Sequence, residues 1–415
     1  MNLCVKNYKS RAAIVLLFAL TVCYLLINIK SGLNGRMRIY DYGIFQQALF
    51  EVAHTFKINP YLTVREQFML NDHVTPIVWF LAPICWITNY HVSTVAFIEF
   101  FFIFFFCWKI YRCSFLSTET SKALALFMAL FSRGIVMAIT FPGHVDLWII
   151  PFLFLLLEAI TFDENRSQFY QILLWPTVIC LFKEIYPYCV LALAGYYLLK
   201  KNYRYFLSLF TIAGVFIIFA KFIRPWLYGP TVDYGDSILA ELFHSPISTL
   251  LTAAKNLDYG KLFKMYYPFF IPGYLLFKHC FRDDHKKRIT LTALMFIFPY
   301  LFIILLLNRF EFHYSAPIIA ILLGVFIFTG TLETIAQNKR LLLLTLILFS
   351  LNGIRGHAGA LPYLFKKNTE GGFFFGNKYK DLIELKNLTD KIPADHLIYA
   401  AAHAIPPILR PGMKI

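Results

Sequence analysis

The sequence predicts an all-α polytopic membrane protein with about 11 transmembrane helices. Hydrophobic residues make up 59% of the 415 residues and charged residues only 15%, and the mean hydropathy is +0.61. Apolar runs of about 18 to 20 residues recur along the chain, long enough to cross a roughly 30 Å hydrocarbon core. Phe (45) and Tyr (25) are abundant, as in helix bundles with aromatic belts at the membrane interfaces.

The predicted spans follow these apolar runs in order. The first run has basic residues before it and no small-residue cleavage site, so we interpret it as a retained span and not as a signal peptide. A further run, residues 74–89, is short and interrupted by Pro76 and Pro83, which suits either a twelfth span or a helix lying partly in the membrane. The predicted spans are residues 12–29, 92–111, 121–140, 145–162, 168–182, 187–199, 205–223, 265–278, 289–307, 314–331 and 340–353.

Clusters of Lys and Arg decide between these alternatives, because cytoplasmic loops carry an excess of both residues. The clusters share one side of the membrane only if residues 74–89 do not cross it. We therefore predict a juxtamembrane or re-entrant element within a long first extracytoplasmic loop, residues 30–91. The N-terminus is then cytoplasmic and the C-terminus extracytoplasmic. A transmembrane domain covers residues 1–353, and residues 354–415 form a small extracytoplasmic segment. The clusters lie near residues 6–11, 109–112, 200–204, 278–288 and 339–340.

The net charge of +15 does not indicate a nucleic-acid partner, because the basic residues gather at the ends of apolar runs and anchor helices there. The excess in the outer loops would attract an anionic lipid headgroup. None of the eight cysteines forms a CxxC pair, so the sequence indicates no disulfide framework and no zinc site. The expected location is the plasma (inner) membrane, in multi-pass form, with the lipid bilayer as a partner.

Ionisable residues collect on the predicted outer side, close to the ends of the spans. Charges at such depth are costly unless they pair with one another or serve a function. These positions therefore contain the candidate site. The residues are Asp41, Asp72, His73, His144, Asp146, Lys183, Glu184, Arg309, Glu311 and His313.

Asp41 stands in IYDYGIFQQALF, residues 39–50, before a stretch that reads as a helix. One interpretation is an N-cap, in which the carboxylate accepts a free backbone N–H. The other is a carboxylate at the outer mouth of the bundle that acts as a general base or a metal ligand. Both roles can hold together. Gln46 is a candidate hydrogen-bonding partner for a polar substrate.

Two further motifs place His beside Asp. In NDHVTP (71–76), His73 precedes an apolar helix, so it either hydrogen-bonds at the interface or orients a substrate. In FPGHVDLW (141–148), Pro142 breaks the chain before His144 and Asp146. This pair suits Mn²⁺ or another divalent ion, although a polar turn with Asp146 as a helix cap would show the same residues.

Two later turns complete the set. In LFKEIYPY (181–188), Lys183 is a candidate phosphate contact and Glu184 a candidate metal or substrate ligand, or the two form an ordinary surface turn. In NRFEFHYSAP (308–317), Arg309, Glu311 and His313 share one face if the segment is extended, which suits a phosphate and a sugar. An interfacial aromatic belt with snorkelling charges is the alternative.

In this order, these motifs resemble the prokaryotic membrane protein family of unknown function 2079 (DUF2079), over about residues 35–410. That family is in turn similar to the GT-C glycosyltransferases, including the dolichyl-phosphate-mannose and aminoarabinose transferases. The resemblance implies a GT-C-like bundle whose first outer loop contains juxtamembrane helices. It rests on YDYGIFQQALFEVAH, NDHVTPIVWFLAPI, FPGHVDLWIIPFLFLLLEA, LFKEIYPYCVLALAGYYLLKK and FHYSAPIIAIL.

The resemblance also implies roles. Asp41 would be the first-loop carboxylate and Asp146 the second-loop acid, and the donor would be a sugar linked to a polyprenyl phosphate. The third turn departs from the family pattern, because Ile185 follows Lys183 and Glu184 where a second acid is usual. This departure puts the dependence on a metal in doubt.

The sequence thus predicts an inverting glycosyltransferase of the cell envelope. Asp41 takes the proton of an acceptor hydroxyl, and the acceptor is a glycan, a lipid or a protein. The negative charge that develops on the phosphate would be stabilised by Lys183 and Arg309, and by Mg²⁺ or Mn²⁺ between Asp146 and Glu184. Two other classes stay open: a transporter or flippase of a lipid-linked or anionic substrate, and a non-catalytic membrane scaffold. His73, His144 and His313 would orient the substrate or complete the metal site.

Overall fold

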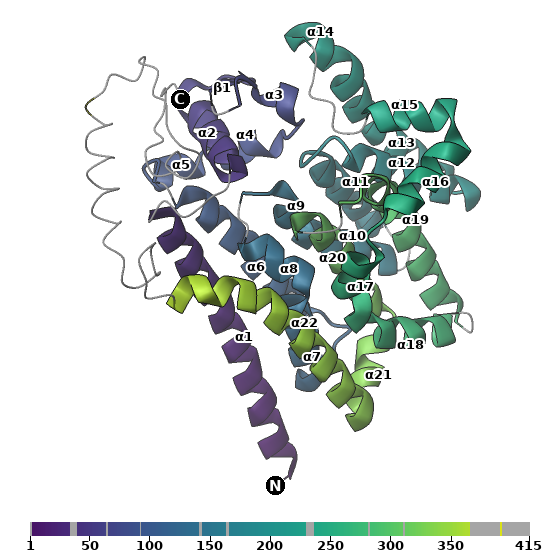
Figure 1. Cartoon of the computed structure of the whole chain (residues 1–415). Coiled ribbons are helices and arrows are strands. Elements are labelled where there is room, and N and C mark those ends of the chain that lie inside the picture. Colours follow the sequence, from purple (N-terminus) through teal and green to yellow (C-terminus); the bar gives the residue numbers. More distant parts are fainter. Residues whose placement is uncertain are drawn as a thin grey trace.

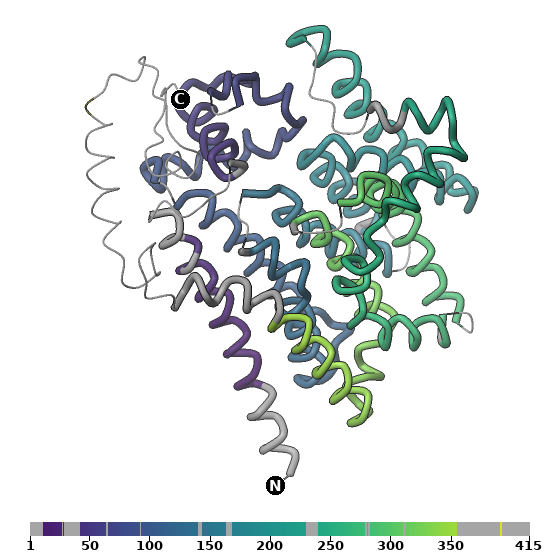
Figure 2. The backbone as a smooth tube through the Cα atoms, in the orientation of Figure 1, coloured from purple at the N-terminus to yellow at the C-terminus, as the bar shows by residue number. Residues whose placement is uncertain are grey.

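The computed structural model describes residues 2–33, 40–63, 65–91, 93–140, 143–162, 166–229, 236–280, 283–309, 312–365 and 391. These residues are mostly helical, which confirms the predicted all-α class (Figure 1). The sheet that they contain is an antiparallel pair of two-residue strands. Figure 2 shows the segments up to α5 on one side of the bundle and those from α13 to α19 on the other.

The long loop between α1 and α6 is folded. Its helix α2 packs against α4, α5 and α6. Two indole N–H groups fasten the short helices below it, because Trp79 donates to the carbonyl of Ile58 at 2.9 Å and Trp86 to that of Ala53 at 3.0 Å. Residues 74–89 contain two short helices, which begin directly after Pro76 and Pro83. The elements are α1 (Asn2–Leu33), α2 (Tyr40–Thr55), β1 (Tyr61–Leu62), β2 (Gln67–Phe68), α3 (Met69–Asp72), α4 (Ile77–Leu81) and α5 (Ile84–Ile87).

The centre of the molecule is a helix bundle built around α10. This helix packs against α6, α11 and α20, while α12 packs against α13 and α19. Its first half contains α6 (Thr94–Arg112), α7 (Glu119–Phe131), α8 (Arg133–Thr140), α9 (Val145–Trp148), α10 (Ile150–Thr161), α11 (Arg166–Cys180) and α12 (Tyr186–Leu199).

The second half ends in α22, which continues through the predicted boundary at residue 353. Of the predicted C-terminal segment, residues 366–390 and 392–415 lie outside the described residues. The elements are α13 (Tyr203–Ile218), η1 (Phe219–Ile223), α14 (Arg224–Tyr228), α15 (Asp236–His244), α16 (Pro246–Asn256), α17 (Tyr259–Tyr266), η2 (Tyr267–Phe269), α18 (Phe270–Cys280), α19 (Asp284–Leu306), η3 (Phe312–Ser315), α20 (Ala316–Phe328), α21 (Thr331–Gln337) and α22 (Lys339–Phe365).

Each of the eleven predicted apolar runs falls on helix, but the count of eleven spans is not confirmed. By length and composition, three helices among the described residues are able to cross a bilayer: Thr94–Arg112, Tyr203–Tyr228 and Asp284–Leu306. Two bent pairs raise this number to five if each pair is one span. One of them bends by 59° between Glu119–Phe131 and Arg133–Ile139, because Ser132 between the two helices adopts an extended conformation.

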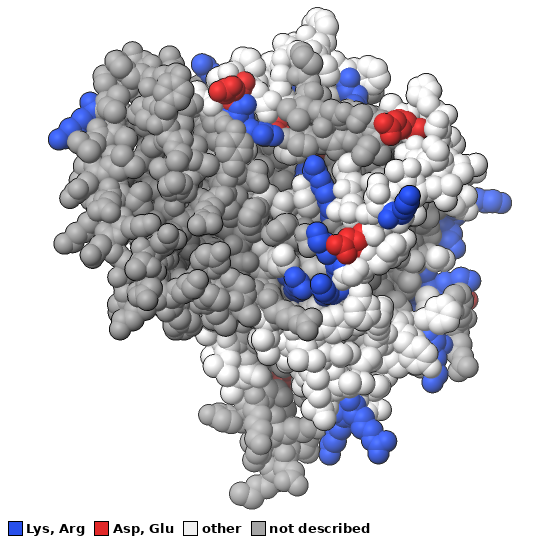
Figure 3. All heavy atoms as spheres, viewed as in Figure 1, with Lys and Arg blue, Asp and Glu red and all other residues white. Residues whose placement is uncertain are grey.

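The surface also fits a membrane protein. Figure 3 shows Lys, Arg, Asp and Glu side chains singly and in small groups, separated by white areas without charge on the described part of this face. The helical stretch Tyr203–Tyr228 turns large apolar side chains outward, among them Val215, Phe222 and Trp226, which are 61%, 69% and 82% exposed. A soluble monomer rarely exposes so much contiguous apolar surface, so these side chains suit contact with lipid.

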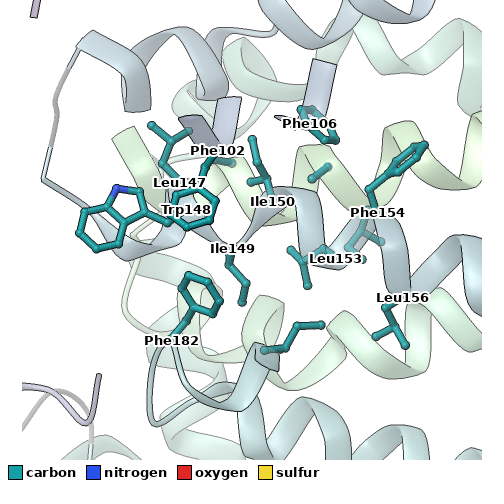
Figure 4. Close-up of a cluster of buried hydrophobic side chains, with 14 of the residues drawn as sticks. Phe102, Phe106, Leu147, Trp148, Ile149, Ile150, Leu153, Phe154, Leu156 and Phe182 are labelled. Atoms are coloured by element: carbon teal, nitrogen blue, oxygen red, sulfur yellow. The ribbon is translucent and has the colours of Figure 1, made fainter. Parts of the chain in front are cut away.

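The core fixes the two turns from which the candidate site is built. Figure 4 shows Trp148, Phe102 and Phe182 among buried side chains from α6, α9, α10 and the 181–185 turn. The rings of Trp148 and Phe102 stack with centroids 6.3 Å apart, and Phe182 meets Phe102 edge-on at 6.3 Å. Residues 147–150 and Phe182 are fully buried. Asp146 and Lys183, which adjoin them, therefore stand on rigid supports.

Candidate functional site

Asp146 lies at the centre of a buried polar cluster. Its carboxylate is in the first turn of α9 and is 1% exposed. Lys183 donates to Oδ2 at 3.1 Å, and the hydroxyls of Tyr186 and Tyr300 donate to Oδ1 at 2.9 and 3.2 Å. An opposite charge and two further donors thus compensate the buried carboxylate. We call the group formed by His144, Asp146, Lys183, Tyr186, Tyr300 and His313 the Asp146 cluster.

Lys183 remains charged in this environment. Burial, the largest single influence, would lower the pKa of its ammonium group, but Asp146, Tyr314 and Glu184 together hold the pKa above its ordinary value. The ammonium nitrogen also lies 5.3 Å from the centroid of the Tyr314 ring, a cation–π distance. The Lys183 side chain keeps 13% of its surface exposed, so it stays accessible to a ligand.

Two histidines from separate segments meet beside this carboxylate. The rings of His144 and His313 stack with centroids 3.4 Å apart and an interplanar angle of 10°. The His313 Nε2 atom lies 3.7 Å from Asp146 Oδ2. Burial, followed by the nearby His313 and Lys183, lowers the pKa of His144 well below its ordinary value, although Asp146 acts in the opposite direction. At neutral pH His144 is therefore an uncharged hydrogen-bonding group.

Glu184, the neighbour of Lys183, turns to a different partner. Its Oε1 atom lies 2.8 Å from Nδ1 of His73, and its Oε2 atom accepts the backbone N–H of Val74 at 3.1 Å. Burial, the largest single influence, would raise the pKa of Glu184, but His73 and Lys183 together outweigh it and lower the pKa to about 2. The backbone N–H of Ile77 also donates to the carbonyl of Leu181 at 2.9 Å. These bonds hold the first loop against the 181–185 turn.

Arg309 stands at the exposed rim of the cluster. Its guanidinium donates to the Tyr314 hydroxyl at 3.3 Å, and Tyr300 donates to the Tyr314 carbonyl at 3.1 Å. Tyr314 therefore links Arg309 to the Asp146 cluster. An exposed arginine beside a buried lysine can meet the outer end of an anionic ligand, since its planar fork suits phosphate oxygens.

The turn that bears His144 also packs directly against α2. Gly143 has a φ of +97°, and a Cβ atom added there would lie 2.6 Å from the Tyr42 Cα atom, so only glycine fits. On the other side of this turn, Glu99 in α6 accepts the backbone N–H groups of Gly143 and His144. The backbone of Asp41, in the first turn of α2, thus adjoins the turn that leads to Asp146.

The structure therefore brings together most of the predicted site residues. Those joined by direct contacts, or through Tyr314, are His144, Asp146, Lys183, His313 and Arg309, and the adjacent pair His73 and Glu184 is fastened to Lys183 through the chain. Asp72 pairs instead with Arg65 at 3.1 Å. Gln46 is fully buried on α2. The side chain of Asp41 and all of Glu311 lie outside the described residues.

The two carboxylates predicted to hold a divalent cation have other partners. The ammonium of Lys183, 3.1 Å from Asp146 Oδ2, already supplies a positive charge to this carboxylate. Both Glu184 oxygens meet donors from the first loop. Within the described ranges, no three His, Cys, Asp or Glu side chains are grouped to hold a metal ion. The divalent cation stays a prediction.

Sequence reasoning missed three contributors. Glu99 interrupts the apolar run FIEFFFIFFF, and an ionisable residue inside a span is itself a signal of function. Tyr186 follows the KEI turn, and Tyr300 follows a proline within the run that became α19. No pattern in the sequence pairs these two hydroxyls with Asp146, because their segments are 40 and 154 residues from it.

Chemically, the arrangement offers a fixed ammonium, an exposed guanidinium, uncharged imidazole and tyrosine hydroxyls at one end of the bundle. Such a set binds an anion and hydrogen-bonds a polyol. Comparison with models of known protein families, with curated proteins and with solved structures finds no match. The resemblance to the GT-C enzymes therefore stays a prediction.

Proposed function

We propose that this protein is a membrane glycosyltransferase of the GT-C type, which moves a sugar from a polyprenyl-phosphate donor to an acceptor hydroxyl. The reaction takes place on the extracytoplasmic side of the plasma membrane. The observation that carries the proposal is the meeting of Lys183 and His313 at the Asp146 carboxylate, with Arg309 at the rim of the cluster and the first turn of α2, which bears Asp41, beside it.

In the proposed step, the acceptor oxygen forms a bond to C1 of the sugar while the bond from C1 to the phosphate oxygen breaks. The proton of the acceptor passes to the carboxylate of Asp41, and polyprenyl phosphate departs with the bonding electron pair. Attack from the face opposite the leaving group inverts the configuration at C1. General base catalysis of this kind contributes roughly 10² to 10⁴ in rate.

The basic residues would stabilise the phosphate leaving group. Phosphate gains negative charge as it departs, and fixed cations stabilise that charge better than water does. Lys183 is held by Asp146 at 3.1 Å, so it needs no reorganisation to face the phosphate. Arg309, at the exposed rim, would meet the outer phosphate oxygens, while His313 and Tyr314 line the way between the two cations.

The test uses purified full-length protein in nanodiscs with radiolabelled polyprenyl-phosphate sugars and a membrane extract that supplies acceptors. We expect label to leave the donor, and Asp41→Asn to slow this transfer by about 10² or more. Asp284→Asn, which changes an exposed carboxylate in the first turn of α19, is the matched control and should keep the full rate. A chelator arm tests the predicted Mg²⁺ or Mn²⁺.

Two outcomes would overturn the proposal. In the first, the donor stays intact across several sugars in the wild type and the variant alike. In the second, labelled donor crosses the bilayer chemically unchanged, which would identify a transporter or flippase. Equal loss of transfer in Asp284→Asn would show that the Asp41→Asn result reports folding and not proton transfer.

A further inference from the structure

A cavity lies at the other end of the helices that hold the Asp146 cluster. It has a volume of about 240 Å³ and is lined by residues from the end of α10, the end of α12 and the beginning of α19. The Asp146 cluster draws on the opposite ends of the same helices. Since α12 has 14 residues, the two sites are separated by about 21 Å along that helix.

The cavity presents donors that lack partners. Tyr196 is 7% exposed, and its buried hydroxyl has no hydrogen-bond partner among the described residues. The same holds for Nε of Arg288, although its terminal nitrogen lies 3.3 Å from Nδ1 of His285 and 3.5 Å from the carbonyl oxygen of Thr161. The ammonium of Lys200 lies 5.9 Å from the Tyr196 ring centroid. Buried donors are normally paired, so this group indicates a bound acceptor.

We propose that this cavity, the Tyr196 pocket, binds a phosphate group. Two cationic side chains and a hydroxyl donor point to an anion, and the described lining contains no Asp or Glu. The volume lies below the roughly 300–1,000 Å³ of sites that enclose a drug-sized ligand, so it suits a phosphate or a small headgroup.

The surroundings favour a phosphate carried by a lipid. Phe162, in the lining, is 43% exposed, and Leu199, next to Lys200, is 77% exposed. Apolar side chains beside a basic pocket allow acyl chains to stay in the bilayer while the headgroup meets the cations. The predicted topology places this end of the bundle at the cytoplasmic leaflet, where anionic lipids are found.

The test titrates purified full-length protein in detergent with three probes: dioctanoyl phosphatidylglycerol, dioctanoyl glycerol, which lacks phosphate, and inorganic phosphate. Native mass spectrometry counts bound molecules, and the thermal unfolding midpoint reports binding in solution. We expect saturable binding of phosphatidylglycerol, weakened about tenfold by Arg288→Gln and at least threefold by Tyr196→Phe. Lys201→Gln is the matched control, because Lys201 adjoins Lys200 without lining the cavity.

Tyr196→Phe also separates binding from folding. Without a probe, loss of an unpaired buried hydroxyl should leave the unfolding midpoint unchanged or raise it, while the shift caused by phosphatidylglycerol shrinks. Tighter binding of the phospholipid than of inorganic phosphate identifies a lipid headgroup, and equal binding identifies a free phosphate. The proposal is overturned if dioctanoyl glycerol binds as well as the phospholipid. It is also overturned if no probe saturates, or if Arg288→Gln and Tyr196→Phe leave binding unchanged.

Discussion

Removal of the Lys183 ammonium tests whether charge compensation holds the Asp146 cluster together. Asp146 is 1% exposed, and Lys183 is its cationic partner at 3.1 Å. Loss of one partner of a buried ion pair costs about 3–5 kcal/mol. The hydroxyls of Tyr186 and Tyr300 continue to donate to the carboxylate, so Lys183→Gln should lie at the lower end, about 3 kcal/mol.

A double-mutant cycle isolates the coupling between the two groups. Asp146→Asn alone leaves Lys183 without its partner and should cost about 2 kcal/mol, because the ammonium is partly exposed. Once both charges are removed, neither group remains uncompensated. The double variant should therefore be about 2 kcal/mol more stable than the sum of the two single losses. Unfolding in mixed micelles of increasing dodecyl sulfate content, followed by tryptophan fluorescence, measures each free energy.

The matched control is Lys122→Gln. Lys122 pairs with Glu119 at 3.4 Å within one helix, near the surface, where such pairs contribute less than about 1 kcal/mol. If Lys183→Gln costs no more than Lys122→Gln, or if the two single losses simply add, Asp146 is not stabilised by Lys183. The reasoning about the site would then be wrong.

Three further predictions concern the turn beside α2. Gly143→Ala should disrupt the packing of this turn and lower the free energy of unfolding more than Gly330→Ala does. Both glycines have a positive φ, but of the two only Gly143 would bring its new Cβ atom against backbone, and chemical denaturation of the two variants measures the difference. Glu99→Leu should lower the free energy of unfolding by about 2–4 kcal/mol, because two backbone N–H groups lose their acceptor. Glu99→Gln keeps an acceptor oxygen and should lower it less, so equal losses would contradict this role of Glu99. The pKa of His144 is lowered on folding, so the unfolded chain binds more protons below its ordinary value of 6.5. Stability should therefore fall as the pH drops from 6.5 towards 5. His144→Gln should make the unfolding midpoint depend less on pH in this range, and an unchanged dependence would contradict the role of His144.

The sequence predicted the helices, whereas the number of membrane crossings is not confirmed. Every apolar run became helix because hydrophobicity and length are local properties. The number of crossings depends on where helices bend, and Ser132 turns one run into two helices at 59°. The two short helices in residues 74–89 follow Pro76 and Pro83, which the sequence does show. A bend between helices that contains no proline gives no comparable signal in the sequence.

For the site, the sequence indicated which residues matter but not how they pair. Lys183 and Glu184 are neighbours, and we predicted that Glu184 joins Asp146 at one metal. In a turn, successive side chains point in different directions, so Lys183 meets Asp146 while Glu184 meets His73. Glu99 went unnoticed because nine apolar residues around it dominate the pattern FIEFFFIFFF. Pairing across 37 to 154 residues is a property of tertiary packing and has no local signal.

The pairing also bears on how an anion would be bound. Asp146 takes one of the three N–H donors of Lys183, so two remain for a phosphate without loss of the ion pair. Arg309 is exposed, and its guanidinium donates to the neutral hydroxyl of Tyr314. A phosphate that meets both cations therefore adds bonds and breaks none. Asp146 would keep the buried Lys183 charged and hold its ammonium group in position before the ligand binds. A buried lysine without such a carboxylate would tend to lose its proton.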